Sequence, residues 1–228
     1  MTSAPERPAP SADRGAPVPA VPAYRRERVE WWSAAAVAVA VLGGVAWAAA
    51  TLPVQAAVIL GVAAAGAYAA WLATNYRHPV VSRAAVATYL CAVAFQIAHM
   101  AEEYAGGFPH EFVELFDSPR RWSEPAFLLV FVFGFNALWC LGAAGALYRV
   151  RVANYLLWFY ALGAGLVNAV SHFVFPVLRG GYFPGLYTAA GHLALSALLV
   201  YVLARDRRRV VREAGYRDGA PVTTETAT

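Results

Sequence analysis

The 228-residue sequence lacks lysine and contains only two cysteines, Cys91 and Cys140. Two cysteines cannot build a disulfide scaffold or a cysteine-rich zinc motif. Charged residues make up only 14% of the chain, whereas hydrophobic residues make up 60%, which is too apolar for the surface of a soluble domain. The net charge of +4 comes from arginines scattered between apolar runs. Nucleic-acid binding requires a clustered basic patch, so we predict no nucleic-acid partner.

Acidic residues, arginine and histidine are absent from residues 31–76, a run of 46 residues. A bilayer core about 30 Å thick needs about 20 residues of helix, so this run predicts two membrane crossings separated at Pro53. Barrel-type alternation is missing, and hydrocarbon otherwise admits only helices. The sequence therefore predicts an all-α integral-membrane helical bundle of about six transmembrane helices, spanning roughly 33–52, 54–74, 84–104, 124–148, 152–178 and 184–204.

The arginines predict how the bundle is oriented. With a cytoplasmic N-terminus, twelve arginines close to the predicted spans fall on the inner side, and three fall on the outer side, namely Arg120, Arg121 and Arg179. The positive-inside rule then places both termini in the cytoplasm of a multi-pass protein of the cell membrane. The lipid bilayer is thus the first expected partner.

Two tails flank the predicted transmembrane domain, which covers residues 29–205. Residues 1–28 are rich in proline and alanine and predict a disordered cytoplasmic tail, because such a segment buries too little apolar surface to order itself. Residues 206–228 are basic and then polar, and predict a second cytoplasmic tail that touches anionic headgroups.

Ionisable groups inside membrane spans are costly, so their positions are informative. The third predicted span carries Gln96, His99, Glu102 and Glu103 in its last two turns. Spacings of three and four residues put Gln96, His99 and Glu103 on one helix face, with Glu102 at its flank. The third span therefore predicts one polar face at its outer end.

Two further spans carry polar groups at a similar depth. The fifth span has Asn168 and His172 four residues apart, and the sixth has Thr188, His192 and Ser196 at the same spacing. Counting about 1.5 Å per residue from the outer ends puts all three span histidines in one slab. We therefore predict a polar cavity that opens outward between the third, fifth and sixth helices. Its expected lining residues are Gln96, Asn136, Asn168, Thr188 and Ser196.

These residues suit two kinds of chemistry. Three imidazoles and a carboxylate are ligands for Zn²⁺ or Fe²⁺, so His99, Glu103, His172 and His192 form a hypothetical divalent-metal site, with Asn168 orienting His172. Alternatively, a desolvated Glu102 or Glu103 holds a proton and acts with His99 as an acid–base pair on a lipophilic small molecule. The expected catalytic residues are His99, Glu102, Glu103 and His172. Either chemistry predicts a membrane enzyme, for example an isomerase or a cyclase.

Two non-enzymatic alternatives remain open at this point. A carrier or ligand-binding protein would also place polar groups inside the bundle. A purely structural polar core would hold the helices together, with Glu102 and Glu103 paired to Arg179 or to the arginines of the outer loop. In that loop, Phe108-Pro109 begins a segment that predicts a short interfacial helix, either a lid over the polar cavity or a wedge in the headgroups.

A family resemblance follows from the third span. His99-Met100-Ala101-Glu102-Glu103 resembles the signature of the HXXEE family of bacterial integral-membrane proteins. The Asn168/His172 pair and Tyr182-x-Pro184-Gly185 resemble the downstream pattern of that family. The resemblance covers roughly residues 86–204 and implies a membrane-helix fold. It implies no particular reaction, because the family has no established activity.

Overall fold

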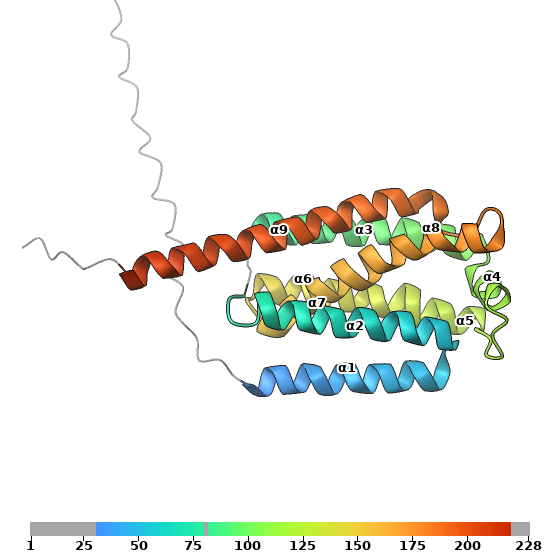
Figure 1. Cartoon of the computed structure of the whole chain (residues 1–228), viewed down its shortest axis with the longest axis horizontal. Helices are drawn as coiled ribbons and strands as arrows, with labels where there is room; N and C mark the ends of the chain where they lie inside the picture. The colour runs from blue at the N-terminus through green and yellow to red at the C-terminus, as the bar shows by residue number, and fades with distance from the viewer. Residues whose placement is uncertain (1–30, 80–81, 220–228) are drawn as a thin grey trace, which may run out of the picture.

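The computed structural model describes residues 31–79 and 82–219, with side chains as far as Arg212. Within these residues every regular element is a helix, and six helical segments are long and apolar enough to cross a membrane. Figure 1 shows them running side by side along one direction. The elements are α1 (Trp31–Thr51), α2 (Val54–Thr74), α3 (Arg83–Ala105), α4 (Phe108–Leu115), α5 (Glu124–Phe127), η1 (Leu128–Gly134), α6 (Phe135–Leu147), α7 (Arg151–Phe159), η2 (Tyr160–Val167), α8 (Asn168–Arg179) and α9 (Leu186–Gly219).

Each of the six predicted spans is a helical segment long and apolar enough to cross a membrane. The fourth span is continuous from α5 through η1 to α6, and the fifth is continuous from α7 through η2 to α8. The last span reaches farther than predicted, because α9 stays helical to Gly219 and carries the basic segment that begins at Arg205. Predicted tail residues 1–28 and 220–228 lie outside the described residues.

Local sequence signals place the helix ends. Pro53, which has no backbone N–H, stands between α1 and α2. The hydroxyl groups of Ser82 and Ser123 accept hydrogen bonds from the backbone N–H groups of Ala85 and Ala126, and so cap α3 and α5. Gly180 ends α8 in the left-handed conformation, with φ of 77°.

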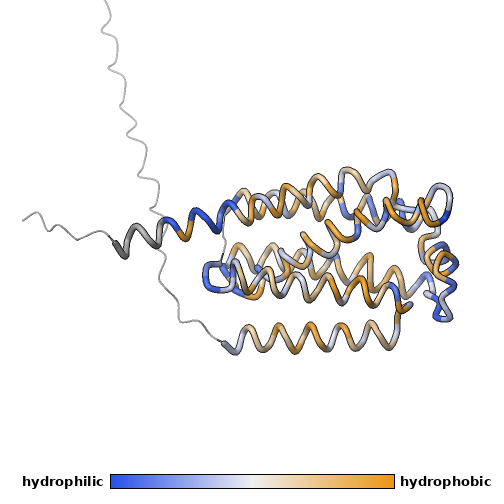
Figure 2. Tube along the Cα trace, in the orientation of Figure 1, coloured by the Kyte–Doolittle hydropathy of each residue, from blue (hydrophilic) through white to orange (hydrophobic). Residues whose placement is uncertain are grey.

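Figure 2 shows hydrophobic residues along the six spans and hydrophilic residues at the two ends and along the turns of α9 that extend past the bundle. The beginning of α1 and the end of α9 lie at the same end of the bundle (Figure 1). Both ends of the described chain therefore lie on one side of a membrane that the six helices would cross. The cytoplasmic assignment of that side stays a prediction.

The site described below depends on the contacts of α3. This helix packs along α9 and against α6, while η2 and α8 pack against α9. The second helix packs against α7 and η2, so it belongs to the bundle that surrounds the site, although the family resemblance begins only at the third span. The first helix packs mainly on α2 and has only three buried residues.

Two spans contain π-helical segments, in which each backbone hydrogen bond joins residues five apart instead of four. η1 covers Leu128–Gly134, and η2 covers Tyr160–Val167 immediately before Asn168. Each segment rotates the side chains that follow it relative to a regular α-helix. The faces that the fourth and fifth spans present to the interior consequently differ from those that α-helical spacing predicts.

The short helix after α3 covers one end of the bundle, and we refer to it as the lid. It begins after Gly107, which adopts φ of 77°, and α4 then packs Phe108, Phe112 and Val113 inside the protein. Phe112 is 2% exposed and stacks on Trp122. This buried aromatic contact fixes α4 over one end of the bundle.

Candidate functional site

His99, Glu103 and His172 converge inside the bundle. The Oε1 atom of Glu103 lies 3.3 Å from His99 Nε2 and 2.7 Å from His172 Nε2. All three side chains are buried, and their potential ligand atoms lie within 4.8 Å of one another. Among the described residues this is the group of histidine, cysteine and carboxylate side chains arranged closely enough to hold a metal ion. The predicted convergence of the third and fifth spans is confirmed.

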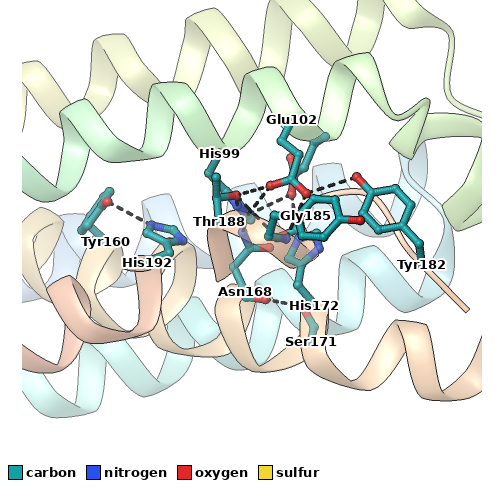
Figure 3. Close-up of polar contacts among 12 residues, drawn as sticks. His99, Glu102, Tyr160, Asn168, Ser171, His172, Tyr182, Gly185, Thr188 and His192 are labelled. Atoms are coloured by element: carbon teal, nitrogen blue, oxygen red, sulfur yellow. Dashed lines mark hydrogen bonds and ion pairs between the residues drawn. The ribbon is translucent and has the colours of Figure 1, made fainter. Parts of the chain in front are cut away.

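His99 is oriented by a chain of two hydrogen bonds, which Figure 3 shows. The Thr188 hydroxyl donates to Glu102 Oε2 over 2.5 Å, and its oxygen lies 2.6 Å from His99 Nδ1. A hydroxyl has one proton, and the carboxylate has already accepted it, so His99 Nδ1 must be the donor to Thr188. Nδ1 of His99 is therefore protonated, and in the neutral ring Nε2 keeps its lone pair.

Glu102 anchors the beginning of α9. Its carboxylate accepts hydrogen bonds from the backbone N–H groups of Tyr187 and Thr188 at 3.0 and 2.9 Å, and from the Tyr182 hydroxyl at 3.1 Å. Partial burial and the bond to Glu102 raise the pKa of Tyr182 to about 12, so this hydroxyl remains a donor at neutral pH. Anionic groups are favourable at a helix N-terminus, where backbone N–H groups lack partners. Glu102 thus holds α9, and the Thr188 hydroxyl with it, against α3.

Asn168 completes the surroundings of His99. Its Nδ2 atom lies 2.9 Å from His99 Nε2 and donates to that lone pair. The Ser171 hydroxyl donates to the backbone carbonyl of Asn168 over 2.7 Å. Because Glu103 Oε1 also faces His99 Nε2, a lone pair and a carboxylate oxygen meet at 3.3 Å. A positive charge between them, either a proton or a metal ion, would stabilise this pair.

His172 is held by close packing rather than by hydrogen bonds. Neither of its ring nitrogens makes an aligned hydrogen bond, although Nε2 is close to Glu103. Its ring stands edge-on to the His99 ring, at 4.7 Å between centroids. Gly185, with φ of 92°, lies against the other side, where a Cβ atom would come within 2.4 Å of His172 Nδ1. The glycine backbone therefore sets the position of this imidazole.

An aromatic cavity of about 110 Å³ adjoins the cluster. Glu103 lines it together with Gln96, Met100, Asn168 and Ser171. The rest of its wall is apolar and includes nine aromatic side chains, namely Phe108, Phe112, Trp122, Phe127, Phe131, Phe135, Trp139, Phe159 and Phe175. A buried carboxylate held by two histidines thus faces a cavity that is polar on one side and aromatic on the others.

Residues 89–200 match a protein-family model described as "Protein of unknown function with HXXEE motif". Over this region, just under half of the chain, the protein is similar to the HXXEE family. The resemblance predicted for residues 86–204 is confirmed, with His99, Glu102 and Glu103 as the named letters of the motif. No curated protein and no solved structure matches the chain.

The cavity differs from the predicted one in its walls. We expected a polar cavity between the third, fifth and sixth helices, but it is mostly aromatic and is lined from α2, the HXXEE helix α3, the lid α4 and the fourth and fifth spans. Ala56, Ile59, Leu60 and Ala63 contribute the α2 wall. Residues of α9 do not appear among the described residues that line it. The sixth span instead contacts α3 through Thr188, which bonds to Glu102 and His99.

Two of the five predicted lining residues, Gln96 and Asn168, line the cavity. In the described part of the chain the other three do not, for reasons that the contacts show. Thr188 is engaged between Glu102 and His99, and Asn136 donates back to the Val132 carbonyl of its own helix. Ser196 is fully buried against Gly165.

His192 is close to the HXXEE histidine but outside the metal-capable group. The rings of His99 and His192 lie 4.9 Å apart, which confirms the predicted common depth. However, His192 Nε2 lies 3.1 Å from the Tyr160 hydroxyl, which itself donates to the Ala92 carbonyl over 2.6 Å. His192 Nε2 is thereby the donor to Tyr160. The described geometry therefore gives three potential ligands where the sequence predicted four.

Sequence reasoning missed Tyr160 and the contribution of α2. A tyrosine inside an apolar span needs a hydrogen-bond partner, and this requirement could have drawn attention to Tyr160. The α2 residues give no such signal, because alanine and isoleucine occur throughout the spans. The alternative pairing of the two motif glutamates with Arg179 is not found, since Arg179 forms an ion pair with Glu111 of the lid.

Proposed function

We propose that the protein is a membrane-embedded, metal-dependent enzyme that acts on a small lipophilic molecule. The observation that carries this proposal is the buried Glu103 carboxylate, which contacts His99 and His172 from two helices and also faces the aromatic cavity. A buried ionisable cluster inside a membrane bundle is costly to maintain, which favours a functional role over a structural one.

The three side chains fit a divalent metal such as Zn²⁺ or Fe²⁺. Neighbouring ligand atoms around a tetrahedral zinc ion with bonds of about 2.0–2.1 Å are about 3.3 Å apart. His99 Nε2 and Glu103 Oε1 already have this separation, and the 2.7 Å pair of His172 and Glu103 has to open by roughly 0.6 Å. The Glu102–Thr188 chain presents His99 in the tautomer that can ligate through Nε2, as groups hydrogen-bonded to metal ligands usually do, and a metal there would displace the Asn168 N–H from this lone pair.

A bound divalent ion would supply a Lewis acid for a polar group of the substrate. The protein residues around it have separate tasks. The aromatic walls exclude water and accommodate the apolar body of the substrate, and low local dielectric strengthens the electrostatic contacts of Glu103. Asn168, which lines the cavity, has an amide group within reach of both His99 and the substrate.

The metal content of the purified protein tests this proposal. In detergent or lipid nanodiscs we expect about one zinc or iron ion per chain by elemental analysis, removable by chelation and restored by reloading. His172→Ala should reduce the bound metal by at least tenfold, whereas His110→Ala should leave it unchanged, because His110 is an exposed residue of the lid paired with Glu124. Wild-type protein should be prepared both aerobically and anaerobically. If neither preparation takes up zinc or iron on reloading, the metal-dependent function is refuted.

A metal-free acid–base enzyme is the second candidate, and one contact favours it. His172 Nε2 and Glu103 Oε1 are 2.7 Å apart, so a small rotation of either side chain would align the two groups to share a proton. In this version the pair moves a proton on the same lipophilic substrate, and the protein retains its activity after complete chelation.

Thr188→Val provides a test of how His99 is positioned. Valine has nearly the shape of threonine but can neither accept from His99 Nδ1 nor donate to Glu102. Loss of a group behind a metal ligand typically reduces metal affinity 10–100-fold, so we expect a decrease of about that size in a competition titration. Thr188→Ser retains the hydroxyl and should restore affinity to within a few-fold. Equal affinities for the valine and serine variants would contradict the orienting role.

A further inference from the structure

Two residues that line the cavity have a buried polar atom without a hydrogen-bond partner, namely the Oε1 acceptor of Gln96 and the Nε1–H donor of Trp122. Gln96 is only 5% exposed and belongs to the polar side of the cavity. A buried acceptor without a partner is destabilising, and the cost is felt fully in a membrane interior, where water does not compete. An unsatisfied group of this kind calls for an explanation, and a ligand that supplies the missing proton is one.

The other polar groups of the cavity wall are also acceptors. Glu103 in its ionised form has only acceptor atoms. The Ser171 hydroxyl has donated its proton to the backbone carbonyl of Asn168, and one of the two Asn168 Nδ2 protons is engaged with His99 Nε2. The polar side of the cavity therefore offers several lone pairs, besides the remaining N–H groups of the two amides. A ligand that brings a hydrogen-bond donor can satisfy Gln96 Oε1, whereas an ether or a hydrocarbon cannot.

We propose that the substrate is a lipophilic alcohol, and that Gln96 Oε1 recognises its hydroxyl group. The proposal rests on the proposed function in taking this cavity as the substrate site. The cavity is similar in size to the cavity of about 150 Å³ that holds benzene in an engineered protein, so one small ring or a branched chain of similar bulk fits among its aromatic side chains. A hydroxyl is the favoured donor because, unlike an ammonium group, it enters the bilayer without desolvating a charge.

The position of Gln96 on α3 supports this assignment. Gln96, Met100 and Glu103 are spaced by four and three residues and all line the cavity, so they form one continuous face of the helix. Gln96 precedes His99 by three residues, or about 4.5 Å along the helix axis. A hydroxyl bound by Gln96 thus holds the apolar body of the alcohol beside the His99–Glu103–His172 cluster.

The test uses three matched probes, 4-fluorobenzyl alcohol, its methyl ether and 4-fluorotoluene. Binding to the protein in lipid nanodiscs is followed by fluorine NMR, with empty nanodiscs used to subtract partition into lipid. We expect the alcohol to bind wild type about tenfold more tightly than the ether or the hydrocarbon, since an unpaired buried acceptor costs about that much in affinity. Equal or tighter binding of the ether by wild type would overturn the proposal.

Variants then assign the preference to Gln96. Gln96→Met keeps an unbranched side chain of similar length but offers no comparable acceptor. The affinity for the alcohol should therefore fall to that for the ether, while the affinity for the ether should change by no more than about twofold. Met100→Leu, on the same wall, changes shape without polarity and should keep the alcohol preference. If Gln96→Met retains that preference, the assignment is wrong. Metal content measured in the same samples distinguishes the two proposals, because alcohol selectivity without bound metal contradicts only the metal-dependent function.

Discussion

Glu103→Gln is expected to weaken metal binding at least 100-fold while the protein remains folded. Glutamine has the same shape as glutamate, so the packing of α3 is preserved, but the only anionic member of the His99–Glu103–His172 cluster is lost. Divalent metal sites depend on deprotonated ligands, and a neutral amide oxygen between two imidazoles is a poor substitute. The measurement is a competition titration with a chromophoric chelator, accompanied by a thermal melt in detergent.

Glu102→Gln is the matched control, because it makes the same chemical change one residue earlier. Its amide oxygen, in the position of Oε2, can still accept from the Thr188 hydroxyl and the Thr188 backbone N–H, although the bond from the Tyr187 N–H to Oε1 is lost. We expect a loss of metal affinity of about tenfold, acting through the orientation of His99. If Glu102→Gln had the larger effect of the two, Glu102 would be the ligand and the proposed arrangement of the site would be wrong.

The two glutamates of the motif illustrate what the sequence could and could not predict. Adjacent residues on a helix are separated by about 100°, so they cannot serve the same side of the structure. The spacing of four residues correctly predicted that Glu103 lies beside His99. It could not predict that Glu102 would be engaged by Tyr182 and by the first N–H groups of α9, because those contacts are made across some 80 residues of sequence.

The spans themselves were predictable because hydrophobic length is a local property. Each of the six runs carries its own signal, and proline or a capping serine marks several of their ends. The common depth of His99, His172 and His192 was also predictable, since it follows from counting residues from the outer ends of the spans. Both inferences need only the helical rise and the thickness of a bilayer.

Rotation of the helices about their axes was not predictable, and the cavity depends on it. The π-helical segment η2 ends just before Asn168 and changes the angle between Tyr160 and Asn168, which regular spacing sets at about 80°. Tyr160 faces His192 and Asn168 faces the cavity, so the fifth span contributes to two separate polar contacts. The sequence contains no signal from which these register changes, or the α2 wall of the cavity, could have been derived.

Gly185→Ala is expected to abolish metal binding as completely as removal of His172. The added Cβ atom would lie 2.4 Å from Nδ1 and 2.5 Å from Cε1 of the His172 ring, distances that non-bonded atoms cannot maintain. His172 is fully buried and its ring packs against Phe175 on its own helix, so it cannot move aside without losing Nε2 from the site. Loss of one of three ligands should reduce bound metal at least tenfold in elemental analysis.

Two other glycines in the connection between α8 and α9 provide control variants. They distinguish displacement of the His172 ring from strain in the backbone. Gly180 has φ of 77° but open space at its Cβ position, so Gly180→Ala should cost about 1–2 kcal/mol of stability and retain the metal. Gly181 has neither a positive φ nor a neighbour within 4 Å, and Gly181→Ala should change neither property. If Gly180→Ala and Gly185→Ala lost metal to the same extent, the cause would be strain in the connection. If only Gly185→Ala loses its metal, the absence of a side chain at Gly185 is what allows the His172 imidazole to lie next to Glu103.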